Sequence, residues 1–271
     1  MSEILNMLSY HFMQRALIVG VLVSLCAALL GVSLVLKRFS MIGDGLSHVG
    51  FGALAVASAL GLAPLAVAVP VVVAAAVFLL RLRKSSRVKG DAAIAIISSS
   101  ALSIGVITVS LTTGMNTEVS SYMFGSVLSL SRGDAVLSVV LSLAVLALFV
   151  LLYPRIFAVT FDEDFSRATG TNTELYNTLL AVLTAVTVVL GMRMMGALLI
   201  SSLIIFPALA AMRLCKSFKA VVITAGAISV ACFLAGLTGS YFLETPTGAS
   251  IVAADLIAFA AACAIGRVHR V

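Results

Sequence analysis

Residues 14–36 read QRALIVGVLVSLCAALLGVSLVL, with Arg15 as the one charged residue. A helix needs about 20 predominantly apolar residues to cross the hydrocarbon core of a bilayer, so this run is long enough to span it. The rest of the chain has the same character, since 62% of its residues are apolar, 10% are charged and the mean hydropathy is +1.20. This composition excludes a soluble domain with a polar surface and predicts a polytopic membrane protein.

Eight further apolar runs follow the first one. They are 42–62, 64–80, 92–113, 134–153, 174–191, 195–212, 219–241 and 248–268. The pair at 174–191 and 195–212 is short and is interrupted by Arg193 and Gly196, so it forms either two spans or one span and a half-helix that dips into the membrane. We therefore predict an all-α membrane protein, a bundle of eight or nine transmembrane helices that forms a single domain over 1–271.

The basic residues lie at the ends of these runs. With nine spans, every Lys and Arg except Arg15, Arg132 and Arg193 falls on one side of the membrane. The positive-inside rule makes that side the cytoplasm, which places the N-terminus outside a cell membrane and the C-terminus inside. The net charge of +6 is then a matter of topology and of contact with anionic lipid, and it does not indicate nucleic-acid binding.

The polar string GDGLSHVGFG, residues 43–52, lies within the second run. Asp44 and His48 are four residues apart, so they lie on the same face of a helix and can share one cation. Imidazole suits zinc, and a carboxylate accepts both zinc and manganese. Two structural alternatives remain: Asp44 caps the N-terminus of the helix, and His48 is a packed side chain bonded to nearby backbone.

The expected depth of this pair is a difficulty. Asp44 follows Arg38 by six residues, so a rise of about 1.5 Å per helical residue puts the pair within about 10 Å of the basic residues on the cytoplasmic side. Either the pair lies nearer the inner face than the middle of the membrane, or the basic side chains reach outward from a deeper level.

Three other residues stand out within the apolar runs. Asp255 lies in the last run, where an unpaired charge is costly, so it faces the bundle interior or a partner, or it is protonated. We treat it as a secondary candidate metal ligand. Gly196 and Pro207 are candidate helix breaks or gating positions, because broken helices are common in transporters.

The longest segment too polar to span is PRIFAVTFDEDFSRATGTNT, residues 154–173. The acidic cluster Asp162–Asp164 and the later Gly170 are typical start and stop signals of a short helix, and we predict an amphipathic helix between them. An ordinary solvated loop is the alternative.

Five segments occur in an order that resembles the zinc/manganese/iron permease family of ABC importers. They are GDGLSHVG, SSYMFGSVL at 120–128, the acidic segment ending in SRATG, MGALLISSLIIFPALAA at 195–211 and ETPTGASIV at 244–252. The resemblance spans nearly the whole chain. It implies a permease subunit, not itself an enzyme, that forms a homodimer, docks on two cytoplasmic ATPase subunits and receives metal from an extracellular or periplasmic binding protein.

The resemblance also assigns roles to single residues. It implies that the helix within 154–173 is a coupling helix that sits in a groove of the ATPase, with Asp164, Phe165, Ala168 and Gly170 at the matching positions.

For the metal, the resemblance carries over onto Asp44 and His48 as ligands in the translocation pathway. Two ligands from each copy make four across a dimer, although two ligands plus water are also possible. The metal is then a cargo, and no resident cofactor is implied. The histidine and the lack of further acidic residues nearby in the sequence favour zinc over manganese, with iron third.

No segment matches the phosphate-binding pattern GxxxxGK[ST], so this chain does not supply a P-loop for ATP hydrolysis. The main hypothesis is therefore a metal-importing permease driven by ATP that another subunit hydrolyses. A stand-alone secondary transporter or channel for divalent cations is the rival from another class. That rival would want ionisable residues in several spans, and the runs offer only a few.

Overall fold

The computed structural model describes residues 9–84, 90–112, 125 and 131–268. Within these residues the chain forms helices and no strands, as the sequence predicts. Apart from Gly125, the segment SSYMFGSVL lies outside the described residues. The helices are α2 (His11–Leu36), α3 (Ile42–Ala59), α4 (Pro64–Lys84), α5 (Gly90–Thr112), α7 (Arg132–Leu151), α8 (Tyr153–Phe161), α9 (Glu163–Ala168), α10 (Thr173–Met195), α11 (Ala197–Leu214), α12 (Phe218–Leu243) and α13 (Thr247–Val268).

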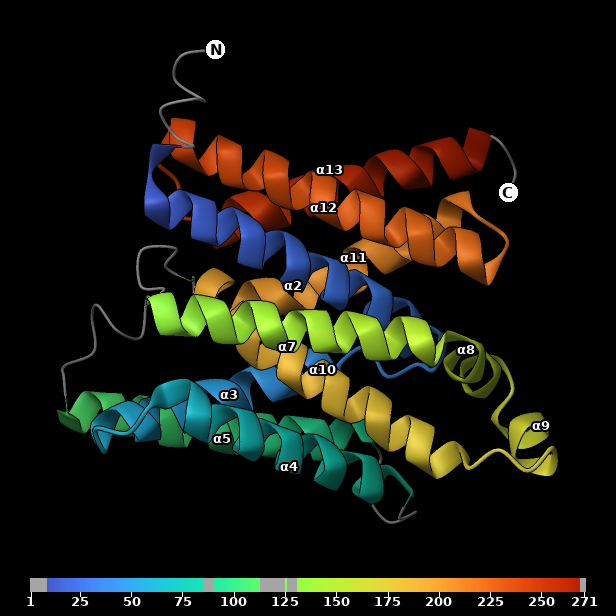
Figure 1. Ribbon diagram of the computed structural model, residues 1–271, viewed down its shortest axis with the longest axis horizontal. Coiled ribbons are helices and arrows are strands. Elements are labelled where there is room, and N and C mark those ends of the chain that lie inside the picture. The colour runs from blue at the N-terminus through green and yellow to red at the C-terminus, as the bar shows by residue number, and fades with distance from the viewer. Residues whose placement is uncertain (1–8, 85–89, 113–124, 126–130, 269–271) are drawn as a thin grey trace.

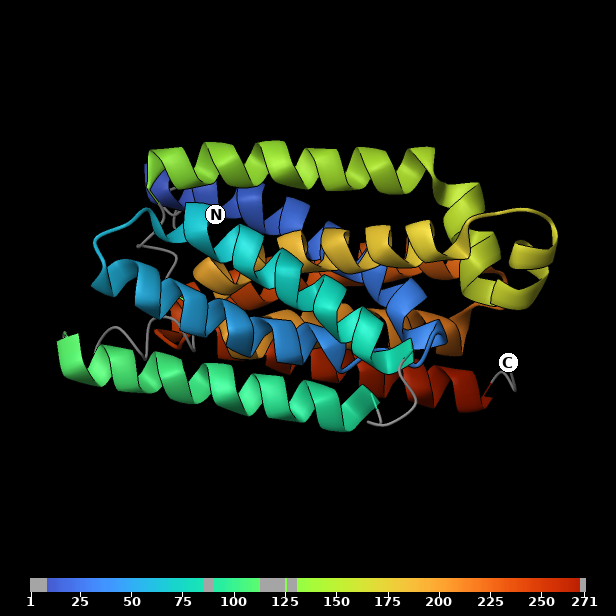
Figure 2. The same ribbon diagram turned by 90° about the horizontal axis from the view of Figure 1, so that it is seen from below.

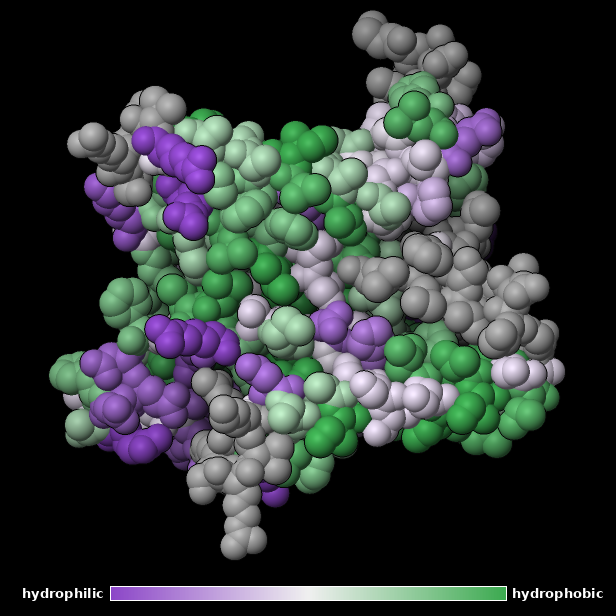
Figure 3. Space-filling view, turned by 180° about the vertical axis from the view of Figure 1, so that it is seen from behind, coloured by the Kyte–Doolittle hydropathy of each residue, from purple (hydrophilic) through white to green (hydrophobic). Residues whose placement is uncertain are grey.

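The long helices run roughly along one axis of the molecule, as Figures 1 and 2 show. The short helices α8 and α9 lie together at one end of this bundle, where α13 also ends, and α2 begins at the opposite end. We call these the α9 end and the far end. On the face that Figure 3 shows, hydrophilic residues gather mainly at the α9 end, while hydrophobic residues predominate over most of the remainder, with a smaller polar patch near the centre. This distribution is that of a membrane domain with one strongly charged end.

Each of the nine predicted runs coincides with one long helix. Seven of these helices are long and apolar enough to cross a membrane. The exceptions are α3, which carries Asp44 and His48 near its start, and α11, whose apolar part is the shorter stretch Leu199–Leu214. The predicted count of eight or nine spans is therefore not confirmed.

The predicted interruption at Gly196 is present, and the one at Pro207 is not. Gly196 separates α10 from α11 with a φ of 89°, a backbone conformation that side chains with a Cβ rarely adopt. Pro207 lies inside α11, which continues on both sides of it. Pro207 therefore does not end a helix, and a gating role for it stays a prediction.

Helices α2 and α10 form the interior of the bundle. In each, 67% of the residues in the most apolar window are buried, against 28% or less in α4, α5, α7 and α13. In Figure 1, α2 passes between α12 on one side and α7 on the other. The outer helices keep large apolar side chains exposed, among them Leu111 and Val150, as expected for surfaces that face lipid.

Close packing of α2 against α11 depends on Gly31. A Cβ at this position would lie 2.0 Å from the carbonyl oxygen of Ile204, far inside van der Waals contact. The missing side chain lets the two backbones approach, as small residues commonly do between membrane helices.

Helix α8 is not predicted by the sequence pattern. The polar segment 154–173 predicts a single short helix, whereas α8 begins at Tyr153, with only Leu152 between it and the end of α7. Pro154 occupies the first turn of α8, where its lack of an N–H costs no helical hydrogen bond. The proline therefore begins a new helix at this point.

Candidate functional site

Asp44 and His48 lie one turn apart near the start of α3, on the same face, as predicted. Nε2 of His48 is 3.8 Å from Oδ2 of Asp44. The His48 side chain is 19% exposed and the Asp44 side chain is 38% exposed. Both groups are thus close enough to contact one cation and open enough to receive it.

The structure excludes the capping alternative for Asp44. Met41 occupies the N-cap position of α3, and Asp44 lies within the first turn. Its carboxylate instead accepts a hydrogen bond from the Ser201 hydroxyl of α11, at 3.2 Å. The Ser47 hydroxyl donates to the backbone carbonyl of Asp44 at 2.7 Å. Asp44 is therefore held from two helices that lie far apart in the sequence.

The pair opens into a cavity of about 260 Å³ between α3 and α5. A third ionisable residue, Asp91, lines the same cavity from the first turn of α5. Ser98 of α5 also lines it, and its buried hydroxyl has no hydrogen-bond partner among the described residues. The cavity therefore combines two carboxylates, an imidazole and a hydroxyl that is available to a ligand or to water.

The sequence does not predict Asp91 beside the pair, since no further acidic residue lies near Asp44 and His48 along the chain. Asp91 directly precedes the run at 92–113, and an acidic residue there is what a helix N-terminus ordinarily carries. Only the packing of α5 against α3 brings it to the cavity. Close approach of the two helices is possible because Gly52 of α3 faces the carbonyl oxygen of Ala101, which would lie 2.6 Å from a Cβ at Gly52.

The described part of the chain holds no group of three or more His, Cys, Asp or Glu side chains that could bind one metal ion together. Asp44 and His48 are therefore fewer than the four ligands of a tetrahedral zinc site, and their role as metal ligands stays a prediction.

Asp255 lies elsewhere in the fold. It is 1% exposed within α13, and neither carboxylate oxygen has a hydrogen-bond partner of ordinary geometry among the described residues. The thiol of Cys232 on α12 is close enough to interact with it. The structure does not bring Asp255 into the cavity with Asp44 and His48, and its role as a metal ligand stays a prediction.

The contacts of Asp44 also bear on the depth of the pair. Ser201 lies near the start of α11, so about 20 Å of helix at about 1.5 Å per residue separates it from the α9 end of α11. Gly43, beside Asp44, packs against Ile204 of the same helix. The pair is therefore recessed from the α9 end of α11, and both alternatives for its depth in the membrane stay predictions.

Arg193, which did not fit the predicted charge distribution, has an acidic partner. Its Nη2 lies 3.1 Å from Oδ2 of Asp134. Asp134 is in the first turn of α7 and Arg193 is in the last turn of α10, both toward the far end. Both side chains are less than a fifth exposed. A buried charge with an opposite partner is tolerated, so Arg193 does not argue against the predicted orientation.

The predicted helix in the acidic segment is α9. Asp162 caps it, with its carboxylate accepting a hydrogen bond from the N–H of Phe165 at 2.8 Å, and Gly170 follows its end with a φ of 84°. The four residues assigned to ATPase coupling are all exposed: Asp164, Phe165, Ala168 and Gly170. Phe165 is 64% exposed, an unusual exposure for a large apolar side chain at a polar end of the molecule.

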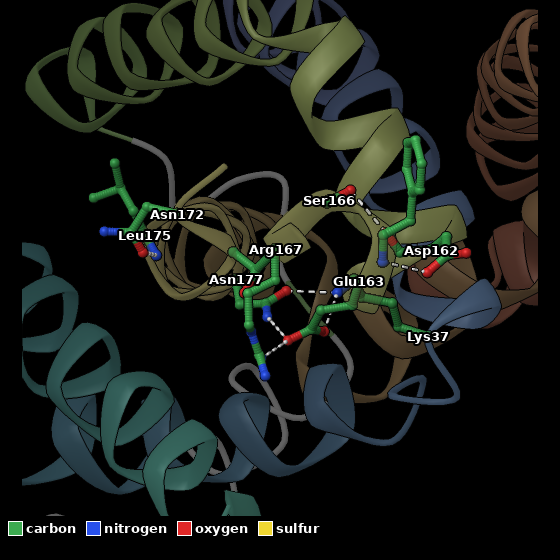
Figure 4. Close-up of polar contacts among 10 residues, drawn as sticks. Lys37, Asp162, Glu163, Ser166, Arg167, Asn172, Leu175 and Asn177 are labelled. Carbon is green, nitrogen blue, oxygen red and sulfur yellow. Dashed lines mark hydrogen bonds and ion pairs between the residues drawn. The ribbon is translucent and has the colours of Figure 1, made fainter. Parts of the chain in front are cut away.

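The opposite face of α9 is attached to the bundle by Glu163 (Figure 4). Its carboxylate accepts from the ammonium group of Lys37, at the end of α2, at 3.2 Å. It also accepts from the side-chain amide of Asn177 in α10 at 3.0 Å and from Arg167 at 3.3 Å. Burial alone would raise the pKa of Glu163, but the Asn177 hydrogen bond and the charges of Lys37 and Arg167 together hold that pKa below its usual value.

Comparisons with known proteins agree with this arrangement. The model of a family described as the ABC 3 transport family matches residues 9–266. A protein of Haemophilus influenzae described as "Probable iron transport system membrane protein" is 31% identical over 269 residues, which are 98% of each chain. The high-affinity zinc uptake system membrane protein ZnuB of the same organism is 30% identical over 250 residues, 92% of this chain and 96% of that one.

A solved structure has the same fold. The structure of PsaBC from Streptococcus pneumoniae in complex with Fab contains a chain that superposes with a TM-score of 0.87 at 28% sequence identity. The match covers 96% of this chain and 94% of that chain. The similarity therefore extends over nearly the whole chain.

Proposed function

Because the chain belongs to the ABC 3 transport family, and is a permease subunit of a metal ABC importer, we propose that it carries a divalent transition-metal ion across the cell membrane through the cavity beside α3. Zinc is our first candidate for the cargo, with manganese and iron as alternatives. The chain itself is a transport subunit and not an enzyme.

The observation that carries this proposal is the placement of Asp44 and His48. Both side chains line one cavity, and Ser201 orients the carboxylate from a neighbouring helix. Ionisable residues among membrane helices are energetically costly, and where they occur they commonly mark a substrate pathway. A chain that supplies only part of the ligand set also suits transport, because a permanently closed set of four ligands would release its metal slowly.

The proposed partners follow from the two ends of the molecule. We place the α9 end in the cytoplasm because Lys37, Arg155 and Lys219 lie at helix ends there. The exposed face of α9 would contact a dimer of ABC ATPase subunits. The far end would receive metal from an extracellular or periplasmic binding protein, and a second copy of the chain would complete the ligand set. On this basis α3 and α11 also lie within the membrane, as the eighth and ninth helices of the domain.

The identity of the metal depends on the donor set. His48 favours zinc, but Asp91 adds a second carboxylate to the cavity, and carboxylate oxygens favour harder ions such as manganese. The relatives described above are associated with iron in one case and zinc in the other. We therefore expect zinc to be preferred over manganese by a modest margin.

Reconstitution tests the proposal against the stand-alone alternative. We expect vesicles that contain the chain together with its ATPase subunit and metal-binding protein to accumulate zinc, manganese or iron only when ATP is supplied on the ATPase side. Vesicles with this chain alone should accumulate none of the three. ATP-independent uptake by the chain alone would support a secondary transporter or channel, and the absence of ATP-dependent uptake of all three metals would refute the proposal.

Acidification is expected to slow this uptake. An imidazole must be neutral to ligate a metal, so protons compete with the cargo for His48. The measurement compares initial uptake at about pH 5.5 and about pH 7.5, with ATP hydrolysis followed in the same samples to remove any effect on the ATPase. Uptake per ATP that stays flat over this range would contradict the assignment of His48 as a ligand.

A further inference from the structure

A closed set of polar contacts joins α9 to the end of α2. The Lys37 ammonium group donates to Oε2 of Glu163 at 3.2 Å and to the side-chain oxygen of Asn177. The Asn177 amide in turn donates to Oε1 of Glu163 at 3.0 Å. Each of the three side chains thus contacts the other two, and they come from α2, α9 and α10 (Figure 4).

These contacts are partly shielded from water. The Lys37 side chain is 13% exposed and that of Glu163 is 36% exposed, while Asn177 is 9% exposed. They border a cavity of about 200 Å³ whose other walls include Leu34, Phe39 and Leu180. Hydrogen bonds between charged groups are stronger than neutral ones, and salt screens them less when one partner is buried. The contact between α9 and α2 is therefore stronger than an ion pair between two fully exposed side chains.

Lys37 is also connected rigidly to the metal-binding helix. It is the C-cap residue of α2, and Arg38 then adopts a left-handed conformation with a φ of 54°. The N–H of Phe39 donates to the carbonyl of Leu34 at 2.8 Å, and the Phe39 ring is buried at 8% exposure. α3 begins three residues later with Asp44 in its first turn. This short turn is fixed by hydrogen bonding and by packing, so displacement of Lys37 displaces the start of α3.

We propose that Lys37, Glu163 and Asn177 are positioning residues that transmit movement of α9 to Asp44 and His48. This inference rests on the proposed function, because it takes α9 as the surface that contacts the ATPase and α3 as the helix that holds the metal. Glu163 would follow α9 when the ATPase moves it. Lys37 would then shift the turn before α3 and change the placement of Asp44 relative to Ser201.

The test measures metal ions imported per ATP hydrolysed, in vesicles that contain the complete transporter. Lys37→Met and Glu163→Gln each remove one charge, and Gln at 163 can still accept from Asn177. We expect either variant to hydrolyse ATP at close to the wild-type rate while the ratio of ions to ATP falls about tenfold, as suits the loss of a shielded charge-assisted hydrogen bond. Co-purification of the ATPase confirms that the complex is assembled.

Matched variants separate this role from a merely structural one. Lys37→Arg retains the charge and should restore most of the ratio. Arg167→Gln removes the other cation that contacts Glu163. Because the Arg167 side chain is 63% exposed, this variant should change the ratio of ions to ATP less than about twofold. The double variant Lys37→Met with Glu163→Gln should be no worse than either single variant, because both remove the same interaction.

Two results overturn the inference. One is a wild-type ratio in both single variants, and the other is an equal loss of uptake and ATP hydrolysis, which indicates that the contacts only hold the complex together. Failure of the wild-type transporter to import zinc, manganese or iron is a different result, since it overturns the proposed function itself.

Discussion

Replacing His48 with alanine is expected to reduce metal accumulation by cells that express the complete transporter at least about 100-fold. Loss of a residue that merely supports a ligand commonly reduces metal affinity about 10- to 100-fold, and His48 is the one imidazole among the described residues that line the cavity. Asp44→Asn should have a comparable effect, because the amide keeps an oxygen that can accept from Ser201 but is a poor metal ligand.

The measurement is total cellular zinc, manganese and iron by mass spectrometry in metal-starved cells, at matched membrane levels of each variant. His11→Ala is the control, since His11 is an exposed histidine at the start of α2, far from the cavity. If one metal rises with wild type and with His11→Ala but not with His48→Ala, that metal is the cargo and His48 lies in its path. Equal accumulation by all three proteins would show that His48 is a packing residue.

The second large effect is expected at the exposed face of α9. Ala168→Arg should abolish stable association with the ATPase, because Ala168 is exposed beside Phe165 on the proposed contact surface, where a long charged side chain would hold the two surfaces apart. Phe165→Ala should weaken association about tenfold or more, since truncation of a central aromatic residue commonly costs an interface 2 kcal/mol or more.

Association can be measured by co-purification of the ATPase with the permease in detergent, followed by ATP-dependent uptake in vesicles. Glu244→Arg is the control, because it introduces the same side chain at an exposed position at the far end. Retention of the ATPase by Ala168→Arg would mean that the ATPase binds another surface of the permease.

The sequence predicted the parts of this fold that depend on local pattern. Apolar runs of membrane length became helices, the four-residue spacing of Asp44 and His48 placed them on one face of α3, and the acidic cluster before Gly170 marked α9. In each case the physical signal lies within about 20 neighbouring residues, as helix periodicity and capping require.

The rest depends on contacts between distant segments. Ser201 is 157 residues from Asp44, and Glu163 is 126 residues from Lys37. In the sequence, Lys37 indicates only topology, and no pattern marks Ser201, Asp91 or Asn177 as part of a site. Each of these has an ordinary role by itself, as a helix-end charge or a tolerated polar residue. Only the packing of the helices against one another brings these residues together into the cavity and the polar contacts described above. The helices concerned are α2, α3, α5, α9, α10 and α11.

The partial ligand set of each chain has a thermodynamic consequence. In the proposed dimer, the Asp44 and His48 side chains of both copies come together only while two copies of α3 face each other across the pathway, so metal affinity depends on the distance between subunits. Metal–ligand distances in a bound site stay within about 0.2 Å of their standard values. A small separation of the two copies would therefore release the metal, while the arrangement of donors within each chain stays unchanged. ATP hydrolysis would then lower the metal affinity only by changing the distance between the subunits.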